Sequence, residues 1–239
     1  MTALIFDMDG VLVETIELHF AAWRQIAAQV GKSLGPDALE DLRGLRRDDC
    51  LRRIFAPDEL SLHDLATYSA VKDDLYLTAL HEMNPESLIT PGTSAFLEHA
   101  RQNGCRLGVA SSSVNTFTVL EHTRLLDYFD VVADGRTVVR SKPHPDVFLW
   151  VAGALGVPAH KTIIFEDAQA GIAAAEAIGA FVVGIGNGKA ARKAAWYAPD
   201  LVDIDLQLLI EQVQNRDTAL PIMSQSKSAN GTQYQNQRR

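Results

Sequence analysis

Cysteine is scarce in this sequence, which contains only Cys50 and Cys105. The two form no spacing motif, so the sequence predicts no disulfide framework. No apolar run reaches the roughly 20 residues that a membrane helix needs. The first residues also lack the basic, apolar and cleavage regions of a signal peptide. We therefore expect a cytoplasmic protein without a membrane partner.

Positive charge is also in short supply, because 22 lysines and arginines face 30 aspartates and glutamates, for a net charge of −8. This balance argues against nucleic acid or an anionic membrane as a general partner. A small anionic substrate is still compatible with it, because a local cation cluster can override the overall charge. The 239 residues, 47% of them hydrophobic, are typical of a globular protein, expected here as a monomer.

Short apolar runs alternate with helical patterns along most of the chain. The runs that predict buried parallel strands are 3–6, 105–110, 129–134, 162–167 and 180–186. Helices are predicted at 92–103, 115–126, 144–155 and 169–178. Such alternation is typical of an α/β fold with a doubly wound parallel sheet.

Residues 16–82 interrupt this alternation, because they have helical patterns throughout and no convincing strand. We predict that they form an inserted all-helical domain, and that residues 1–15 and 83–215 form the α/β core. The last segment, 216–239, is rich in Ser, Gln, Asn and Gly. That composition predicts a disordered tail.

The first predicted strand lies in "LIFDMDGVLV" and is followed by Asp7 and Asp9. Two buried carboxylates cost free energy unless a cation or a shared proton compensates them. Ligands of open α/β sheets bind at the carboxyl ends of the strands. Three further predicted strands end near polar residues, which are Ser111, Ser112, Ser113, Lys142, Glu166 and Asp167.

These side chains together favour phosphoryl-transfer chemistry. Asp7, Asp9, Glu166 and Asp167 would form a Mg²⁺ site that also takes phosphate oxygens, while Lys142 and the serine hydroxyls would bind the phosphate. With its charge shielded, Asp7 can attack phosphorus and form an aspartyl-phosphate. Asp9 can then exchange a proton with the leaving or attacking oxygen. Each motif alone is common in solvated loops and helix caps, and it is their order at successive strand ends that favours catalysis.

The four motifs "DMDGV", "ASSS", "SKPHPD" and "FEDAQAGI" resemble, in order and across about 1–190, those of the haloacid dehalogenase superfamily. The resemblance implies that Asp7 is the nucleophile and Asp9 the acid/base, and that Ser111 and Lys142 bind phosphate. It also implies a Mg²⁺ site supplied or supported by Asp7, the Met8 carbonyl, Asp9, Glu166 and Asp167. The second aspartate argues against the dehalogenase branch.

The helical insert after the first motif is similar to the cap of the branch that holds β-phosphoglucomutase and many sugar-phosphate phosphatases. "DGVLVETIELHFAAW" resembles the entry segment of that cap, and "LRGLRRDDCL" resembles its loop. The resemblance implies a hinge at Thr15 and a contact between Arg47 and a distal phosphate. The substrate contacts expected in this way are Thr15, His19, Trp23, Gly44, Leu45, Arg47, Lys72, Ser113 and Asn115.

Other interpretations stay open for the cap residues. His19 and Trp23 could have a packing role in the cap without contacting substrate, and Arg47 could lie on a solvated face. Val114 stands where the mutase loop has a lysine, and Glu14 and Cys50 also depart from the mutase pattern. The resemblance implies a Mg²⁺-dependent phosphomutase that interconverts β-glucose 1-phosphate and glucose 6-phosphate through a bisphosphate. The alternatives are a phosphatase of the same branch and a catalytically idle sugar-phosphate binding module.

Overall fold

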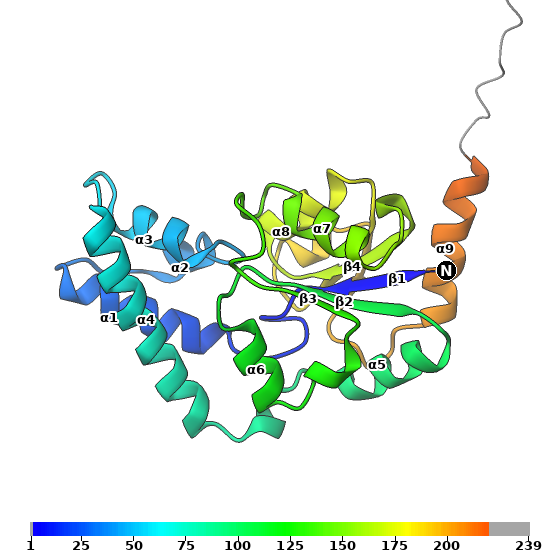
Figure 1. Cartoon of the computed structure of the whole chain (residues 1–239), viewed down its shortest axis with the longest axis horizontal. Coiled ribbons are helices and arrows are strands. Elements are labelled where there is room, and N and C mark those ends of the chain that lie inside the picture. Colours follow the sequence, from blue (N-terminus) through cyan, green and yellow to red (C-terminus); the bar gives the residue numbers. More distant parts are fainter. Residues whose placement is uncertain (1, 220–239) are drawn as a thin grey trace, which may run out of the picture.

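The computed structural model of the chain describes residues 2–219, in which six parallel strands form one sheet in the order β3-β2-β1-β4-β5-β6 (Figure 1). The strands are β1 (Ala3–Phe6), β2 (Arg106–Ala110), β3 (Val131–Ala133), β4 (Thr162–Glu166), β5 (Phe181–Ile185) and β6 (Trp196–Ala198). The order reverses direction at β1, which lies between β2 and β4. The predicted doubly wound parallel sheet is confirmed, although the short edge strand β6 was not predicted.

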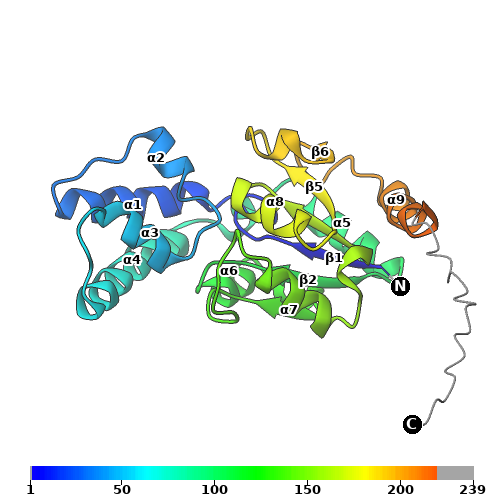
Figure 2. The ribbon, with the colours of Figure 1, turned by 90° about the horizontal axis from the view of Figure 1, so that it is seen from above.

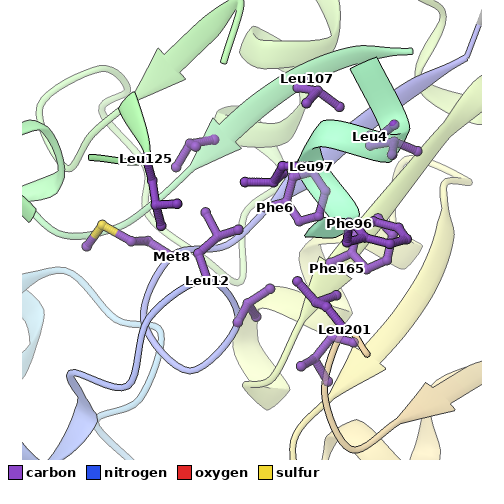
Figure 3. Packing of buried hydrophobic residues seen from close by; sticks show 14 of the residues in the cluster. Leu4, Phe6, Met8, Leu12, Phe96, Leu97, Leu107, Leu125, Phe165 and Leu201 are labelled. Carbon is purple, nitrogen blue, oxygen red and sulfur yellow. The ribbon is translucent and has the colours of Figure 1, made fainter. Parts of the chain in front are cut away.

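The central strand β1 is buried on both faces, and its side chains alternate between two hydrophobic clusters. Leu4 and Phe6 belong to the first cluster, shown in Figure 3, where the ring of Phe6 stacks on Phe165 at 4.5 Å between centroids. Ala3 and Ile5 belong to the second cluster on the other face. This is the period-two alternation of a strand, here with both faces apolar because both are covered.

Five helices cover the two faces of the sheet. They are α5 (Thr93–Gln102), α6 (Thr116–His122), α7 (Asp146–Ala154), α8 (Gln169–Glu176) and α9 (Leu206–Ala219). Residues of α5, α6 and α9 enter the first cluster, and residues of α7 and α8 enter the second. Short 3₁₀ turns complete the described chain at Pro85–Leu88, Leu126–Tyr128, Ala159–Lys161 and Ala191–Lys193.

The helices between β1 and the rest of the core lie together beyond the carboxyl ends of the strands (Figure 2). They are α1 (Ile16–Gln29), α2 (Pro36–Glu40), α3 (Arg47–Phe55) and α4 (Leu62–Glu82), and we call residues 16–82 the cap. The cap has a hydrophobic cluster of its own, which includes Trp23, Ile26, Leu39 and Leu51. This apolar surface packs within the cap itself. The cap therefore lies opposite the polar edge of the sheet as a separately packed unit.

The C-terminal part of the described chain differs from the prediction. Helix α9 was not predicted, and it continues to Ala219, so the tail predicted from residue 216 begins inside a helix. The helix forms because Leu206, Leu209 and Val213 recur at helical spacing and pack on the first cluster. The remaining predicted tail, 220–239, lies outside the described residues. Among residues 2–219, no helix is long and apolar enough to cross a membrane.

Candidate active site

A buried lysine joins two of the predicted strand ends. Lys142, 1% exposed, lies on the loop that follows β3 and donates from Nζ to Asp7 Oδ1 at 2.5 Å and to Glu166 Oε2 at 2.8 Å. Asp7 directly follows β1, and its N–H donates to the Phe165 carbonyl of the neighbouring strand β4. The sheet therefore brings together three side chains that are far apart in the sequence, as the sequence predicts.

Three buried carboxylates converge beside this lysine. The ligand atoms of Asp7, Glu166 and Asp167 all lie within 4.8 Å of one another. Burial and the neighbouring Glu166 raise the pKa of Asp7, against the opposing effect of Lys142. Burial, opposed by Arg43, raises the pKa of Asp167 to about 7. A concentration of three hard carboxylate donors fits a Mg²⁺ ion. We call these three residues the carboxylate cluster.

Glycines of two motifs leave room for the carboxylate cluster. Gly10 has a φ of +87°, and a Cβ atom there would lie 2.1 Å from Asp167 Oδ2. A Cβ atom at Gly171 would lie 2.1 Å from the carboxyl carbon of Glu166. The "DMDGV" and "FEDAQAGI" motifs therefore need glycine for steric reasons, because any side chain would displace a carboxylate of the cluster.

Asp9 lies outside the carboxylate cluster, although we predicted it as a metal ligand. Its Oδ1 accepts a hydrogen bond from the Thr15 hydroxyl and lies 3.4 Å from His19 Nε2. The Met8 carbonyl, also expected at the metal site, accepts hydrogen bonds from the N–H groups of Leu12 and Val13 at 2.9 and 3.1 Å. The tight turn closed by these bonds follows β1 directly, and the Asp9 carboxylate contacts the start of the cap.

The surroundings of Asp9 favour its carboxylate form. Burial acts to raise the pKa of Asp9, but His19, Thr15 and Lys72 outweigh it and lower the pKa below its ordinary value. Lys72 Nζ lies 2.9 Å from His19 Nδ1, and an ammonium can only donate, so Nδ1 accepts and Nε2 carries the ring proton toward Asp9. Burial lowers the pKa of His19, and it lowers that of Lys72 to about 8. A polar chain thus runs from Lys72 through His19 to Asp9.

The same lysine contacts two aromatic rings of the cap. Lys72 Nζ lies 4.5 Å from the centre of the Tyr76 ring and 5.4 Å from that of Trp23. The His19 ring stacks on Tyr76 at 4.2 Å. Trp23 also belongs to the hydrophobic cluster of the cap. Packing in the cap is therefore one role of Trp23, and contact with substrate stays a prediction for both His19 and Trp23.

A pocket between the cap and the core, which we call the cap pocket, collects most of the predicted residues. Those in its lining are Asp7, Asp9, His19, Trp23, Gly44, Leu45, Arg47, Lys72, Ser113 and Asp167. The predicted residues outside the lining are Thr15, Ser111, Asn115, Lys142 and Glu166. Ser111 is buried, and its Oγ accepts a hydrogen bond from the Ser113 N–H at 3.0 Å, so it shapes the loop after β2.

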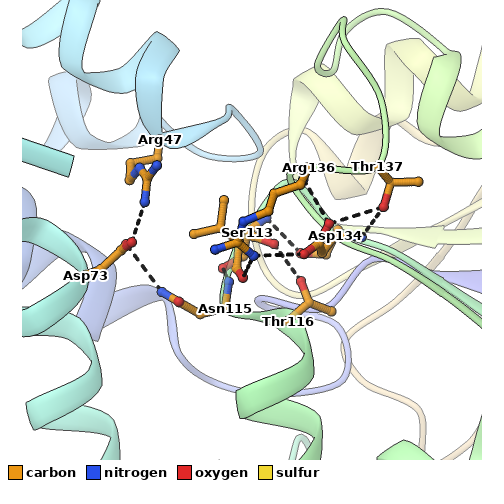
Figure 4. A network of polar contacts seen from close by, with 10 residues as sticks. Arg47, Asp73, Ser113, Asn115, Thr116, Asp134, Arg136 and Thr137 are labelled. Atoms are coloured by element: carbon orange, nitrogen blue, oxygen red, sulfur yellow. Dashed lines mark hydrogen bonds and ion pairs between the residues drawn. The ribbon is translucent and has the colours of Figure 1, made fainter. Parts of the chain in front are cut away.

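Arg47 lies in the cap pocket and not on a solvated face. Its guanidinium is paired with Asp73, which also accepts a hydrogen bond from the Asn115 side chain at 3.4 Å (Figure 4). The loop that carries Asn115 is held by Arg136, which donates to the Val114 carbonyl at 2.7 Å. A cap cation and the loop after β2 therefore meet on one wall of the pocket.

Comparison with known proteins shows where this site belongs. Residues 4–185 match the sequence pattern of the haloacid dehalogenase-like hydrolases. The chain belongs to that family. It is 34% identical over 216 residues to the β-phosphoglucomutase of Bacillus subtilis, covering 89% of this chain and 95% of that one. It is 32% identical over 189 residues to a phosphorylated carbohydrates phosphatase of Thermotoga maritima, covering 75% and 82% of the two chains.

A solved structure gives the same result. The β-phosphoglucomutase of Clostridium difficile superimposes with a TM-score of 0.85 at 31% identity, over 91% of this chain and 99% of that one. The predicted family and its β-phosphoglucomutase-like branch are thus confirmed. Because the relatives include both mutases and phosphatases, membership of the family establishes phosphoryl-transfer or hydrolysis chemistry in general.

In this haloacid dehalogenase-like hydrolase, the sequence reasoning missed two charged residues of the cap pocket, Asp73, which pairs with Arg47, and Arg43. Arg43, on the loop between α2 and α3, forms an ion pair with Asp167 and lines the cap pocket. The Gly44 carbonyl next to it accepts a hydrogen bond from Ser112 at 2.8 Å, so the loop is fixed to the core. The motif "LRGLRRDDCL" contains several arginines, and nothing local distinguishes the one that reaches a carboxylate 124 positions away.

Proposed function

We propose that this haloacid dehalogenase-like hydrolase is a Mg²⁺-dependent phosphomutase that interconverts β-D-glucose 1-phosphate and glucose 6-phosphate. The reaction would pass through an aspartyl-phosphate and a sugar bisphosphate. The observation that carries the proposal is that Asp7 and Arg47 line the same pocket. A mutase must hold two phosphates at once, and the similarity to two β-phosphoglucomutases over 89% and 91% of this chain supports this choice.

Asp7 would be the nucleophile. Lys142 holds its Oδ1, so the attack on phosphorus would use Oδ2, and the ammonium would offset the charge of the incoming phosphate. Asp7, Glu166 and Asp167 would hold Mg²⁺, which when bound supplies positive charge that shields the carboxylate cluster and the phosphate oxygens. Lys142 also bridges to Glu166, which keeps the nucleophile in a fixed orientation.

Asp9 would move the proton. Its lowered pKa favours the base form, which can accept the proton of a sugar hydroxyl as that oxygen attacks the phosphoryl group. In the reverse step the protonated Asp9 would give the proton back to the leaving sugar oxygen. The Thr15 hydroxyl and the His19 ring hold the carboxylate in place, so these two cap-side residues would act by positioning Asp9.

Arg47 would bind the phosphate that is not reacting. A guanidinium can contact a phosphate through two parallel N–H groups, and Ser113 lies in the lining of the same pocket. Arg47 would have to exchange its ion pair with Asp73 for the phosphate. Trp23, Leu45 and Gly44 would face the sugar between the two phosphates.

A phosphatase of the same branch is the second candidate. Val114 gives the pocket an apolar side chain beside Ser113, where a cation would help to hold a second phosphate. The similarity to the phosphorylated carbohydrates phosphatase of T. maritima also favours it. In either case we propose a small phosphorylated sugar as the substrate, and a monomer that works in the reducing cytoplasm, where its two buried cysteines stay free.

Product analysis separates these candidates. Purified protein would be incubated with β-glucose 1-phosphate, MgCl₂ and a trace of β-glucose 1,6-bisphosphate, while glucose 6-phosphate and free phosphate are followed in parallel. A mutase forms glucose 6-phosphate much faster than free phosphate. Phosphate released in step with free glucose would assign a phosphatase, and neither product across a panel of hexose phosphates would overturn both. The Asp7→Asn variant serves as the control for contaminating activity.

A further inference from the structure

The guanidinium of Arg43, a cap residue, contacts the carboxylate cluster of the core. Its side chain is 17% exposed and forms an ion pair with Asp167 Oδ2, whose side chain is 5% exposed. Asp167 belongs to the cluster that we propose as the Mg²⁺ site, together with Asp7 and Glu166. The pair joins the cap to the core at the position where the proposed function needs a metal ion.

The guanidinium is held by the cap and not only by Asp167. Arg43 Nη1 contacts both carboxylate oxygens of Glu40 at 3.1 Å. The loop around it is fixed by the bond from Ser112 to the Gly44 carbonyl. Arg43 Nε is buried without a hydrogen-bond partner among the described residues, so contact with Asp167 does not satisfy the whole guanidinium.

The charges of the site disfavour Arg43 and a Mg²⁺ ion together at Asp167. The carboxylate cluster carries three negative charges when all its carboxyl groups are ionised, and Lys142 balances one of them. Arg43 balances a second through Asp167. A Mg²⁺ ion would need the same carboxylate, and two cations held side by side on one buried carboxylate repel each other strongly.

We infer that Arg43 and Mg²⁺ compete for Asp167, so that the metal ion displaces Arg43 and releases the cap loop when it binds. Arg43 is then a positioning residue that couples metal binding to the seating of the cap. The coupling is reciprocal. If bound metal weakens the Arg43–Asp167 ion pair, then the ion pair weakens metal binding by the same free energy. The inference rests on the Mg²⁺ site of the proposed function, but it holds for a mutase and for a phosphatase alike.

Calorimetric titration of the chelator-treated protein with MgCl₂ tests the competition without any turnover. Arg43→Gln should bind Mg²⁺ about tenfold more tightly than the wild type, which corresponds to about 1.4 kcal/mol. Arg46→Gln is the matched control, because Arg46 also bridges from the cap to the core, through the Val139 carbonyl at 2.8 Å, but touches no cluster carboxylate. Its Mg²⁺ affinity should equal that of the wild type.

Hydrogen exchange of the amides at 42–47 gives a second readout. Mg²⁺ should speed exchange there in the wild type and in Arg46→Gln, whereas Arg43→Gln should exchange fast with or without the ion. Thermal unfolding would first establish that each variant is folded, and Arg43→Met, which is also uncharged, would replace Arg43→Gln if the latter were not.

Three results would overturn the inference. One is unchanged or weaker Mg²⁺ binding by the Arg43 variant, and another is an equal gain in Arg46→Gln, which would mean that any loosening of the cap has this effect. The third is a wild type that binds no Mg²⁺ in this titration. That result is distinct, because it would remove the metal site of the proposed function itself.

Discussion

Replacing Arg47 with alanine tests the step on which a mutase and a phosphatase differ. The change removes a cap guanidinium from the pocket that contains Asp7 and leaves the carboxylate cluster untouched. If Arg47 binds the remote phosphate of a bisphosphate, the mutase reaction should weaken. Hydrolysis of acetyl phosphate, which has no remote phosphate, should change little.

The expected loss follows from two opposing contributions. A hydrogen bond to a charged group is worth about 1.5–3 kcal/mol. Arg47 must first give up Asp73, and since the two side chains are 23% and 21% exposed, that pair is worth about 1 kcal/mol or less. The difference is about 0.5–3 kcal/mol, so kcat/KM for the mutase reaction should fall by a factor between roughly two and 150.

Asp73 complicates this variant and also provides its control. Without Arg47, its carboxylate keeps the hydrogen bond from the Asn115 side chain at 3.4 Å, and its charge would repel a phosphate in the pocket. The double variant Arg47→Ala/Asp73→Asn removes that charge, so it should recover the part of the loss that comes from repulsion. The loss that persists in the double variant measures the contact with phosphate.

The assay follows glucose 6-phosphate formation by coupled oxidation, and acetyl phosphate hydrolysis by released phosphate, on the same preparations. A fall of equal size in both reactions would refute the reasoning, because Arg47 would then support the fold of the cap and not the second phosphate. Full recovery of mutase activity in the double variant would refute it as well, since repulsion by Asp73 alone would explain the loss.

Three further variants test other parts of the site. Asp7→Asn keeps the shape of the side chain but removes the attacking anion, so turnover should fall by several orders of magnitude while circular dichroism stays unchanged. Asp9→Asn should lose about 10²–10⁴-fold on sugar phosphates, the usual share of acid/base catalysis, and much less on aryl phosphates, whose leaving groups need little protonation. Lys72→Met concerns stability. The pKa of Lys72 is about 8 in the folded protein against an ordinary 10.5. Between pH 8 and pH 10.5 the unfolded state therefore binds more protons than the folded state. The free energy of unfolding of the wild type should therefore rise by up to about 3 kcal/mol from pH 8 to 10.5 relative to Lys72→Met, measured by urea unfolding.

For each of these variants, one result would contradict the prediction. Near-normal turnover of Asp7→Asn, in a preparation free of wild-type enzyme, would rule out the aspartyl-phosphate. Equal losses of Asp9→Asn on sugar and aryl phosphates would assign Asp9 a structural role. If the unfolding free energies of the wild type and Lys72→Met changed in parallel with pH, the Lys72 ammonium would not be disfavoured by burial.

The sequence by itself was enough to predict the architecture of the core and the edge of the sheet at which the candidate residues meet. Short apolar segments such as Ala3–Phe6 have the local pattern of buried strands, and parallel strands place all their carboxyl ends on one edge. From these two facts it follows that Asp7 and Glu166 lie near each other. The edge strand Trp196–Ala198 was missed, because its three half-buried residues carry little local pattern and become a strand through pairing with β5.

Only the tertiary structure decided how the side chains of the site are paired. Arg43 meets Asp167, Arg47 meets Asp73, and the Asp9 carboxylate contacts Thr15 instead of joining the cluster. These contacts depend on how the cap sits on the core and on the turn after β1. Residues 26 and 124 positions apart in the chain come together in this way. Hydrophobic periodicity is a local pattern over a few residues, and it predicts strands and helices. Ion pairs between the cap and the core depend instead on how these two units pack against each other.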